Sequence, residues 1–274
     1  MEHFSVIIPW SNRDELATTL HANRDIFLKH SSDIIIANCG GDREKLDSLI
    51  QTAELSVRHL YIPAPSFNKS LAINLGVYAS LQDSLFILDS DIILKTDVLD
   101  QAATVLNRDN YIKIRKVYES QPETNPRIPR FLQEEVLTRE VTCTNGRRAV
   151  MYFFTGGDGS RCGSGLLLLK KPLFIRVGGF NSVLQGWGFE DIDFQLRLQF
   201  LLQARQVPLG EVIHLSHSDM FRNVRNNNKQ EDWNKNMAIC YQNYANDLLQ
   251  GTYMTDCETW RAQMSVSDYT FAHS

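Results

Sequence analysis

Three carboxylates stand close together in the segment LQGWGFEDIDF, residues 184–194. Glu190 and Asp191 are adjacent, Asp193 follows two residues later, and the run 186–188, Gly-Trp-Gly, precedes them. A carboxylate in an apolar pocket can act as a general base toward a hydroxyl. Glycines on both sides of a large ring are typical of a segment that closes over a ligand. Acidic residues in the first turn of a helix also complement its dipole, but this accounts for one or two carboxylates and not for Gly-Trp-Gly.

A second acidic pair, Asp89 and Asp91, follows the apolar run 84–88 directly. Two carboxylates at i and i+2 at a strand end can address one divalent ion, and oxygen ligands suit Mn²⁺ or Mg²⁺. A solvated turn is the alternative, but ligands of parallel α/β sheets bind at the carboxyl ends of the strands. His214 and His217, in VIHLSHSD, follow another expected strand. Either could complete the metal shell, and either alone could equally be a structural histidine.

In the first third of the chain, short apolar runs typical of strands alternate with segments that have the apolar spacing of helices. Apolar runs at 4–9, 33–37, 57–62 and 84–88 predict strands, and helical spacing predicts helices at 14–27, 43–53 and 69–80. Strands alternating with helices favour βαβ units and a mainly parallel sheet, so the expected fold class is α/β.

After about residue 105 the pattern changes. We expect a loop at 122–129, a helix at 131–141, a glycine-rich loop at 155–165, a strand at 166–169, helices at 170–177 and 189–202, a strand at 212–215 and a polar segment at 222–229. A final amphipathic helix carries a stripe that periodicity alone assigns to core packing rather than to a cofactor: Trp233, Met237, Tyr241, Tyr244 and Leu248.

Composition narrows the class of protein. The chain has 274 residues, 43% hydrophobic and 22% charged, with a net charge of −4. No basic run indicates a nucleic-acid surface, and no apolar stretch reaches the ~20 residues of a membrane helix. The five cysteines are scattered and odd in number. They predict neither a disulfide framework nor a zinc site, and they favour a reduced, cytoplasmic protein.

Four motifs, in order, resemble those of GT-A glycosyltransferases, specifically the β-1,4-galactosyltransferase family (family 7) and related bacterial family 2 enzymes. They are IIPWSNRDEL (7–16), FNKSLAINLGV (67–77), FILDSDIIL (86–94) and the long block GSGLLLLKKPLFIRVGGFNSVLQGWGFEDIDFQLRL (163–198). The similarity covers most of residues 4–220. The order and spacing of the four motifs make chance an unsatisfactory explanation.

The resemblance implies a single GT-A domain over residues 1–274, with a Rossmann-like nucleotide-binding sheet flanked by helices. Residues 4–105 would form the nucleotide-sugar-binding half, 106–220 the acceptor and catalytic half, and 221–274 a C-terminal helical extension.

The resemblance also implies roles for individual residues. Asp91 would be the principal metal ligand, with Asp89 assisting and His217, or alternatively His214, completing the shell. Trp187 would be the lid, Glu190 would contact the acceptor hydroxyl, Asp191 would be the catalytic base and Asp193 would support the helix start. Pro9, Asn12 and Arg13 would contact the uridine diphosphate. Further substrate-binding residues would be Asn68, Lys69, Asp89 and Gly165.

The implied reaction is inverting transfer of a hexose or N-acetylhexosamine from a UDP-sugar to a carbohydrate hydroxyl, with Mn²⁺ or Mg²⁺ as cofactor. Animal members of the family carry a membrane anchor and disulfides, which this sequence does not indicate, so we expect a bacterial cytoplasmic enzyme of surface polysaccharide synthesis. A lipid-linked acceptor would bring it into peripheral contact with the inner membrane. Cys162 aligns with a bulky tyrosine of the family. UDP-GalNAc and UDP-GlcNAc are therefore as compatible as UDP-Gal. The insert 119–160 is expected to shape acceptor choice.

Two other classes of protein deserve comparison. A non-catalytic nucleotide-sugar-binding module would be expected to lose Asp191 or the metal aspartates first, and this chain keeps them. A nucleotidyltransferase usually carries a basic glycine-rich loop after the first strand, and PWSNRDE contains no glycine. Glycosyl transfer is therefore the favoured interpretation.

Overall fold

The computed structural model describes residues 2–30, 33–95, 98–121, 135–155, 157–217 and 228–271. The elements of the first half are β1 (Phe4–Trp10), α1 (Glu15–Ala22), α2 (Arg24–Lys29), β2 (Asp33–Cys39), α3 (Arg43–Gln51), β3 (Val57–Ile62), α4 (Lys69–Ala79), β4 (Ser84–Ile87), β5 (Ile92–Leu94) and α5 (Val98–Val105). Those of the second half are β6 (Asn110–Glu119), β7 (Glu135–Thr142), β8 (Arg148–Thr155), β9 (Arg161–Lys170), α6 (Lys171–Arg176), α7 (Glu190–Leu202), β10 (Arg205–His214), α8 (Lys229–Ala245), α9 (Tyr253–Trp260) and β11 (Ser265–Tyr269).

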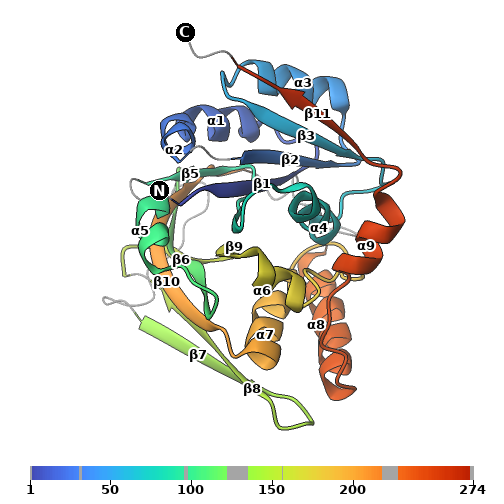
Figure 1. Cartoon of the computed structure of the whole chain (residues 1–274). Helices are drawn as coiled ribbons and strands as arrows, with labels where there is room; N and C mark the ends of the chain where they lie inside the picture. The colour runs from blue at the N-terminus through green and yellow to red at the C-terminus, as the bar shows by residue number, and fades with distance from the viewer. Residues whose placement is uncertain are drawn as a thin grey trace.

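The strands form one mixed sheet in the order β11-β3-β2-β1-β4-β9-β6-β10-β5, with the β7–β8 hairpin attached to β9 (Figure 1). The expected parallel pairing is confirmed for β3, β2, β1 and β4. Beyond β4 the pairing is mostly antiparallel, because β9 runs against both β4 and β6. The expected α/β class is confirmed, but parallel pairing does not extend across the whole sheet.

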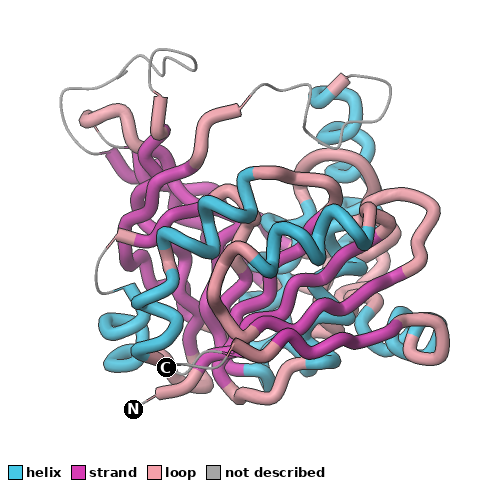
Figure 2. The backbone as a smooth tube through the Cα atoms, turned by 90° about the horizontal axis from the view of Figure 1, so that it is seen from above, coloured by secondary structure: helices cyan, strands magenta, loops and turns pink. Residues whose placement is uncertain are grey.

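Helices cover both faces of the sheet, as Figure 2 shows. Strand β1 is buried throughout, and its residues alternate between the two cores: Val6 and Ile8 face one, Ile7 the other. The first core is closed by α1, α2, α3 and α5, and the second by α4, α6, α7 and α9. A strand with apolar side chains on both faces reads as a continuous apolar run, which is why the central strands were predictable.

A third core lies between α7, α8 and the β7–β8 hairpin. It contains Phe189, Leu196 and Phe200 from the α7 region and Cys240 and Tyr244 from α8. The expected packing role of the final helix is therefore confirmed for Tyr244. Leu248 departs from that prediction, since it lies beyond the end of α8 and is 62% exposed. No helix in the described part of the chain is long and apolar enough to cross a membrane.

The prediction of a helix at 131–141 is wrong for residues 135–141, which are the part that the structure describes. Residues 135–142 form strand β7, which pairs with β8 along its whole length from Glu135–Thr155 to Thr142–Arg148. Four of its eight residues are β-branched, and such residues favour strands. Residues 131–134, the loop expected at 122–129 and most of the polar segment 222–229 lie outside the described residues.

The glycine-rich loop expected at 155–165 is shorter than predicted, because β9 begins at Arg161. A β-carbon at Gly163 would lie 3.0 Å from Cβ of Ile114 on β6. The register between β6 and β9 shifts near this point. The glycine thus permits close approach of two strands at a bulge.

Two other boundaries differ from expectation. The helix expected at 14–27 is divided at Asn23, whose buried amide bonds to the backbone of Ile92 and Leu94 at 2.8 and 2.7 Å. The strand expected at 212–215 begins at Arg205, and its first residues pair with β6. Strands β5, β6, β8 and β11 were not predicted, because short or partly polar strands show little periodicity.

Candidate active site

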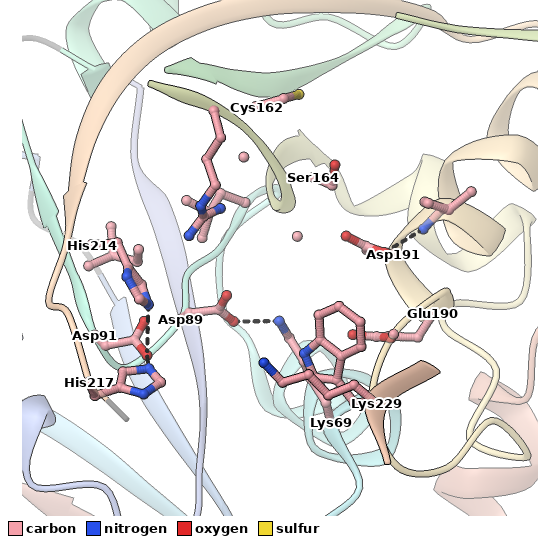
Figure 3. A pocket seen from close by; sticks show the side chains of 18 of the residues that line it. Lys69, Asp89, Asp91, Cys162, Ser164, Glu190, Asp191, His214, His217 and Lys229 are labelled. Atoms are coloured by element: carbon pink, nitrogen blue, oxygen red, sulfur yellow. Dashed lines mark hydrogen bonds and ion pairs between the residues drawn. The ribbon is translucent and has the colours of Figure 1, made fainter. Parts of the chain in front are cut away.

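A cavity of about 1020 Å³ opens where β4 and β10 end and where β9 and α7 begin. Its walls carry most of the residues singled out from the sequence for chemistry (Figure 3). These residues are Lys69, Asp89, Asp91, Gly165, Trp187, Glu190, Asp191, His214 and His217. Segments more than 100 residues apart in the chain therefore meet at one place.

One group on the wall can hold a metal ion. Oδ2 of Asp91 lies 3.2 Å from Nε2 of His217 and 3.6 Å from Nε2 of His214. All three ligand atoms lie within 4.8 Å of one another, so one ion could contact them together. The two histidines were alternatives on the sequence, and the structure brings both to Asp91. Mixed carboxylate and imidazole donors fit a divalent transition metal.

Glu119, which the sequence analysis did not single out, completes this cluster. Its Oε2 lies 2.7 Å from Nδ1 of His214, and Arg161 and Ser216 contact the same carboxylate. Burial lowers the pKa of His214, but the hydrogen bonds to Asp91 and Glu119 outweigh it and raise that pKa to about 9. A carboxylate behind a histidine is the usual partner that orients a metal ligand.

Asp89 has a different environment from Asp91. Its Oδ1 is paired with Nζ of Lys69 at 2.5 Å. A β-carbon at Gly165 would lie 3.2 Å from that ammonium, 3.7 Å from Oδ2 of Asp191 and 3.8 Å from Oδ2 of Asp89. Gly165 thus leaves open the space between the two acidic groups, and a side chain there would fill the centre of the site.

A smaller adjoining pocket, of about 340 Å³, extends from Asp91 toward the end of β1. Pro9 and Arg13 line it, and Nη2 of Arg13 lies 3.3 Å from Oδ2 of Asp91. Asn12 is not among its lining residues, and its side-chain oxygen accepts from the backbone of Asp42 at 2.8 Å. Asn68 caps α4 and donates to the carbonyl of Ser182 at 2.8 Å. Both asparagines hold loops of the protein in this structure.

Glu190 and Asp191 line the opposite wall at the first turn of α7. Oδ1 of Asp191 accepts the Ile192 amide at 2.8 Å, and the carboxyl group points toward the cavity (Figure 3). Burial and the neighbouring Asp191 raise the pKa of Glu190 to about 7. Burial also raises the pKa of Asp191, against the opposing effect of Lys69 and Lys113. Elevated carboxyl pKa values suit proton abstraction near neutral pH.

The Gly-Trp-Gly segment is held by α8. Asp232 accepts the Trp187 amide at 3.1 Å, and Asn236 donates to the Gly188 carbonyl at 2.8 Å. Gly188 has φ +91°, and a β-carbon there would lie 2.7 Å from the ring of Trp233. The next residue, Phe189, is fully buried at φ 74°. A non-glycine residue in the left-handed region is strained and persists only when its surroundings impose it. None of these α8 partners was singled out from the sequence for this role.

Asp193 points away from the cavity, as expected for a residue that supports the helix. It is 1% exposed and accepts from Nε of Arg197 and the phenol of Tyr244, both at 2.8 Å. Arg197 also donates to the carbonyls of Val177 and Gly179 at 2.8 Å. This buried network ties α7 to α8 and to the loop that precedes Trp187, and so fixes where Glu190 and Asp191 stand.

Comparison with known proteins points to the galactosyltransferase-like class that the sequence motifs resemble. The family model described as the N-terminal domain of galactosyltransferase matches residues 148–218, which include β9, α7 and the histidines. The catalytic domain of Drosophila β1,4-galactosyltransferase 7, solved with xylobiose, has 16% identity and a TM-score of 0.50, covering 86% of this chain and 80% of that one.

Staphylococcus aureus TarS is similar in fold as well. Its full structure has 17% identity and a TM-score of 0.58, covering 89% of this chain and 39% of that one. A structure of TarS residues 1–349 gives 16% identity, a TM-score of 0.56 and coverage of 96% and 74%. The matched folds and the galactosyltransferase model, whose residues 148–218 supply part of the cavity wall, show that the chain has a GT-A, galactosyltransferase-like fold and support a glycosyltransferase.

Proposed function

We propose that the protein is an inverting, metal-dependent glycosyltransferase that moves a hexose or N-acetylhexosamine from a UDP-sugar to a carbohydrate hydroxyl. One observation carries the proposal: the cluster of Asp91, His214 and His217 faces the pair Glu190–Asp191 across a single cavity. Such a cavity can hold a nucleotide diphosphate at one wall and an acceptor hydroxyl at the other. A bacterial role in surface polysaccharide synthesis, expected from the resemblance, is part of the proposal.

The donor would lie along the pocket lined by Pro9 and Arg13, with its diphosphate near Asp91. A bound divalent ion neutralises a diphosphate and makes it a better leaving group. Two imidazole nitrogens beside one carboxylate favour Mn²⁺ over Mg²⁺, which prefers oxygen ligands. Arg13 and Lys69 add positive charge at the same wall. When a diphosphate binds there, the side chains of Arg13 and Lys69 can exchange their ion pairs with the aspartates for ion pairs with the diphosphate oxygens.

Asp191 would take the proton from the acceptor hydroxyl, and that oxygen would attack the anomeric carbon opposite the diphosphate. One displacement of this kind inverts the configuration, so an α-linked donor gives a β-linked product. Glu190, one residue away, would accept a hydrogen bond from the acceptor. Trp187 would cover the sugar from the side of α8. The xylobiose bound by the Drosophila enzyme, which is similar in fold, is consistent with a carbohydrate acceptor.

Cys162 bears on the donor sugar. It lines the cavity beside Gly163 and Ser164 and is only partly buried. Its side chain is small, so the wall has room for an acetamido group. UDP-GalNAc and UDP-GlcNAc are therefore proposed as donors alongside UDP-Gal.

The test is release of UDP from a panel of these three donors, with Mn²⁺ and with chelator, using the parent protein and Asp191→Asn. Metal-dependent release from one donor, lost in the variant, supports the proposal and names the donor. Metal-dependent binding of UDP without release from any donor, with or without a panel of sugar acceptors, would favour the non-catalytic binding module instead. Neither release nor binding would overturn the proposed function.

A further inference from the structure

A second pocket, of about 310 Å³, lies behind the Gly-Trp-Gly segment. Its walls come from the loop between β3 and α4, the loop between α6 and α7, and helix α9. Two residues, Phe67 and Gly186, line both this pocket and the 340 Å³ pocket beside Asp91. The second pocket thus shares part of its wall with the pocket beside Asp91.

The charge of this pocket differs from that of the catalytic cavity. Among the described residues that line it, none is Lys, Arg or His, and Asp256 is the one ionisable group. The catalytic cavity, by contrast, is lined by Lys69, Arg161 and Lys229. A phosphate or carboxylate ligand would meet Asp256 without a compensating cation, so the pocket disfavours an anionic ligand.

The polar groups of the pocket are held in place from within the protein. Asp256 is 6% exposed and accepts from Ser182 at 2.7 Å, Asn74 at 2.7 Å and Thr252 at 2.9 Å. An ionised carboxylate has about four acceptor sites, so Asp256 can accept one more hydrogen bond from a ligand. Asn68, fixed by its cap of α4, adds an amide to the same wall.

Another part of the wall is aromatic and aliphatic. Phe67 and Trp260 are partly buried against the core of the sheet, and Pro65 and Leu71 lie beside them. The partly buried indole of Trp260 offers flat apolar surface to a ligand. A pocket that combines apolar surface with fixed polar groups can hold a small molecule.

We propose that this pocket binds a neutral sugar unit, whose hydroxyls bond to Asp256 and Asn68 and whose apolar face packs on Trp260. The proposal rests on the proposed function, since the natural ligand would be a distal sugar of the glycan acceptor. Such a subsite would make the enzyme bind oligosaccharides more tightly than single sugars.

The test measures sugar binding directly, by saturation-transfer NMR on the full chain with saturating UDP and diamagnetic Mg²⁺. The probes are the neutral disaccharides xylobiose, cellobiose, lactose and chitobiose. At least one is expected to give a signal that survives UDP, because the nucleotide occupies the other pocket. Trp260→Ala should abolish the signal, and Trp260→Phe should retain part of it. Met254→Ala, a 59% exposed position on the same helix, should leave it unchanged.

Ser66→Trp provides a second variant that fills the pocket without removing a core side chain, and it should also abolish the signal. Three outcomes would overturn the proposal: no signal from any probe, loss of signal on adding UDP, or an unchanged signal in both Trp260→Ala and Ser66→Trp. UDP release measured on the same samples separates the two claims. UDP release without sugar binding in this pocket would refute only the proposed subsite. Sugar binding without UDP release would refute only the proposed reaction.

Discussion

Nδ1 of His214 lies 2.7 Å from Oε2 of Glu119, a residue 95 positions earlier in the chain. The contact directs Nε2 of His214 toward Asp91 and so orients the metal cluster. Removal of such a partner typically costs 10–100-fold in metal affinity. We expect Glu119→Gln to weaken Mn²⁺ binding by about that factor, measured by calorimetry. Glu211→Gln, in an exposed pair with Lys95, is the matched control. Equal affinity in the two variants would contradict this role.

Substitutions of Asp91 and Asp191 should affect different steps, namely metal-dependent UDP binding and catalysis. Asp91→Ala removes the carboxylate shared by both histidines, and it should abolish metal-dependent binding of UDP. Asp191→Asn keeps the shape of the site but removes the base, so kcat should fall by ~10²–10⁴-fold while UDP binding persists. Calorimetry and a UDP-release assay on both variants check this. Metal-dependent UDP affinity at the parental level in Asp91→Ala, or parental turnover in Asp191→Asn, would refute the corresponding assignment.

The activity should rise with pH. A base works only when deprotonated, and burial raises the pKa of Glu190 to about 7 and that of Asp191 above its usual value. The ascending limb of kcat/KM should therefore lie near pH 7 rather than near 4, and it belongs to the pair rather than to either residue. Lys69 lowers both carboxyl pKa values, so Lys69→Met should move the limb to higher pH. The profile is measured at saturating metal, and a flat profile between pH 5 and 8 would contradict the expectation.

Gly188→Ala should damage the loop that carries Trp187. The alanine would stand at φ +91° with its β-carbon 2.7 Å from the Trp233 ring. Turnover should fall while metal-dependent UDP binding is kept, because the Asp91 cluster is on other elements. Gly146→Ala is the matched control: its φ is +82°, but nothing lies within 4 Å of the added carbon. If both variants lost turnover equally, backbone strain alone rather than displacement of this loop would be the cause.

Tyr244→Phe should lower the free energy of unfolding by about 1.5–3 kcal/mol, the range for a hydrogen bond to a charged group. The phenol donates to the buried Asp193, whose other oxygen is held by Arg197. Tyr241→Phe, on the same helix and 40% exposed, should change the stability little. Urea unfolding of both variants measures the difference. A Tyr244→Phe protein as stable as the Tyr241→Phe control would show that α7 and α8 are not joined through this bond.

Much of this site could be predicted because its residues are local in the sequence. Asp89 and Asp91 follow a buried strand, and Glu190 and Asp191 begin a helix after Gly-Trp-Gly. A strand that is buried on both faces, or a helix with regular apolar spacing, is visible in a short window of residues. The order of these motifs also indicated the GT-A fold before any contact was known.

The tertiary structure decided which residues far apart in the sequence come into contact, because a local sequence pattern does not specify such contacts. Glu119 reaches His214 only because β6 and β10 pair in parallel, and Asp232 reaches Trp187 only because α8 packs against α7. Strand β7 showed no recognisable alternation, since most of its residues are exposed, and its identity depends on pairing with β8. Periodicity reports which face of an element is buried, whereas the partner across the interface depends on the whole fold. The chain by itself therefore determined which groups could do chemistry, and packing decided which groups support them.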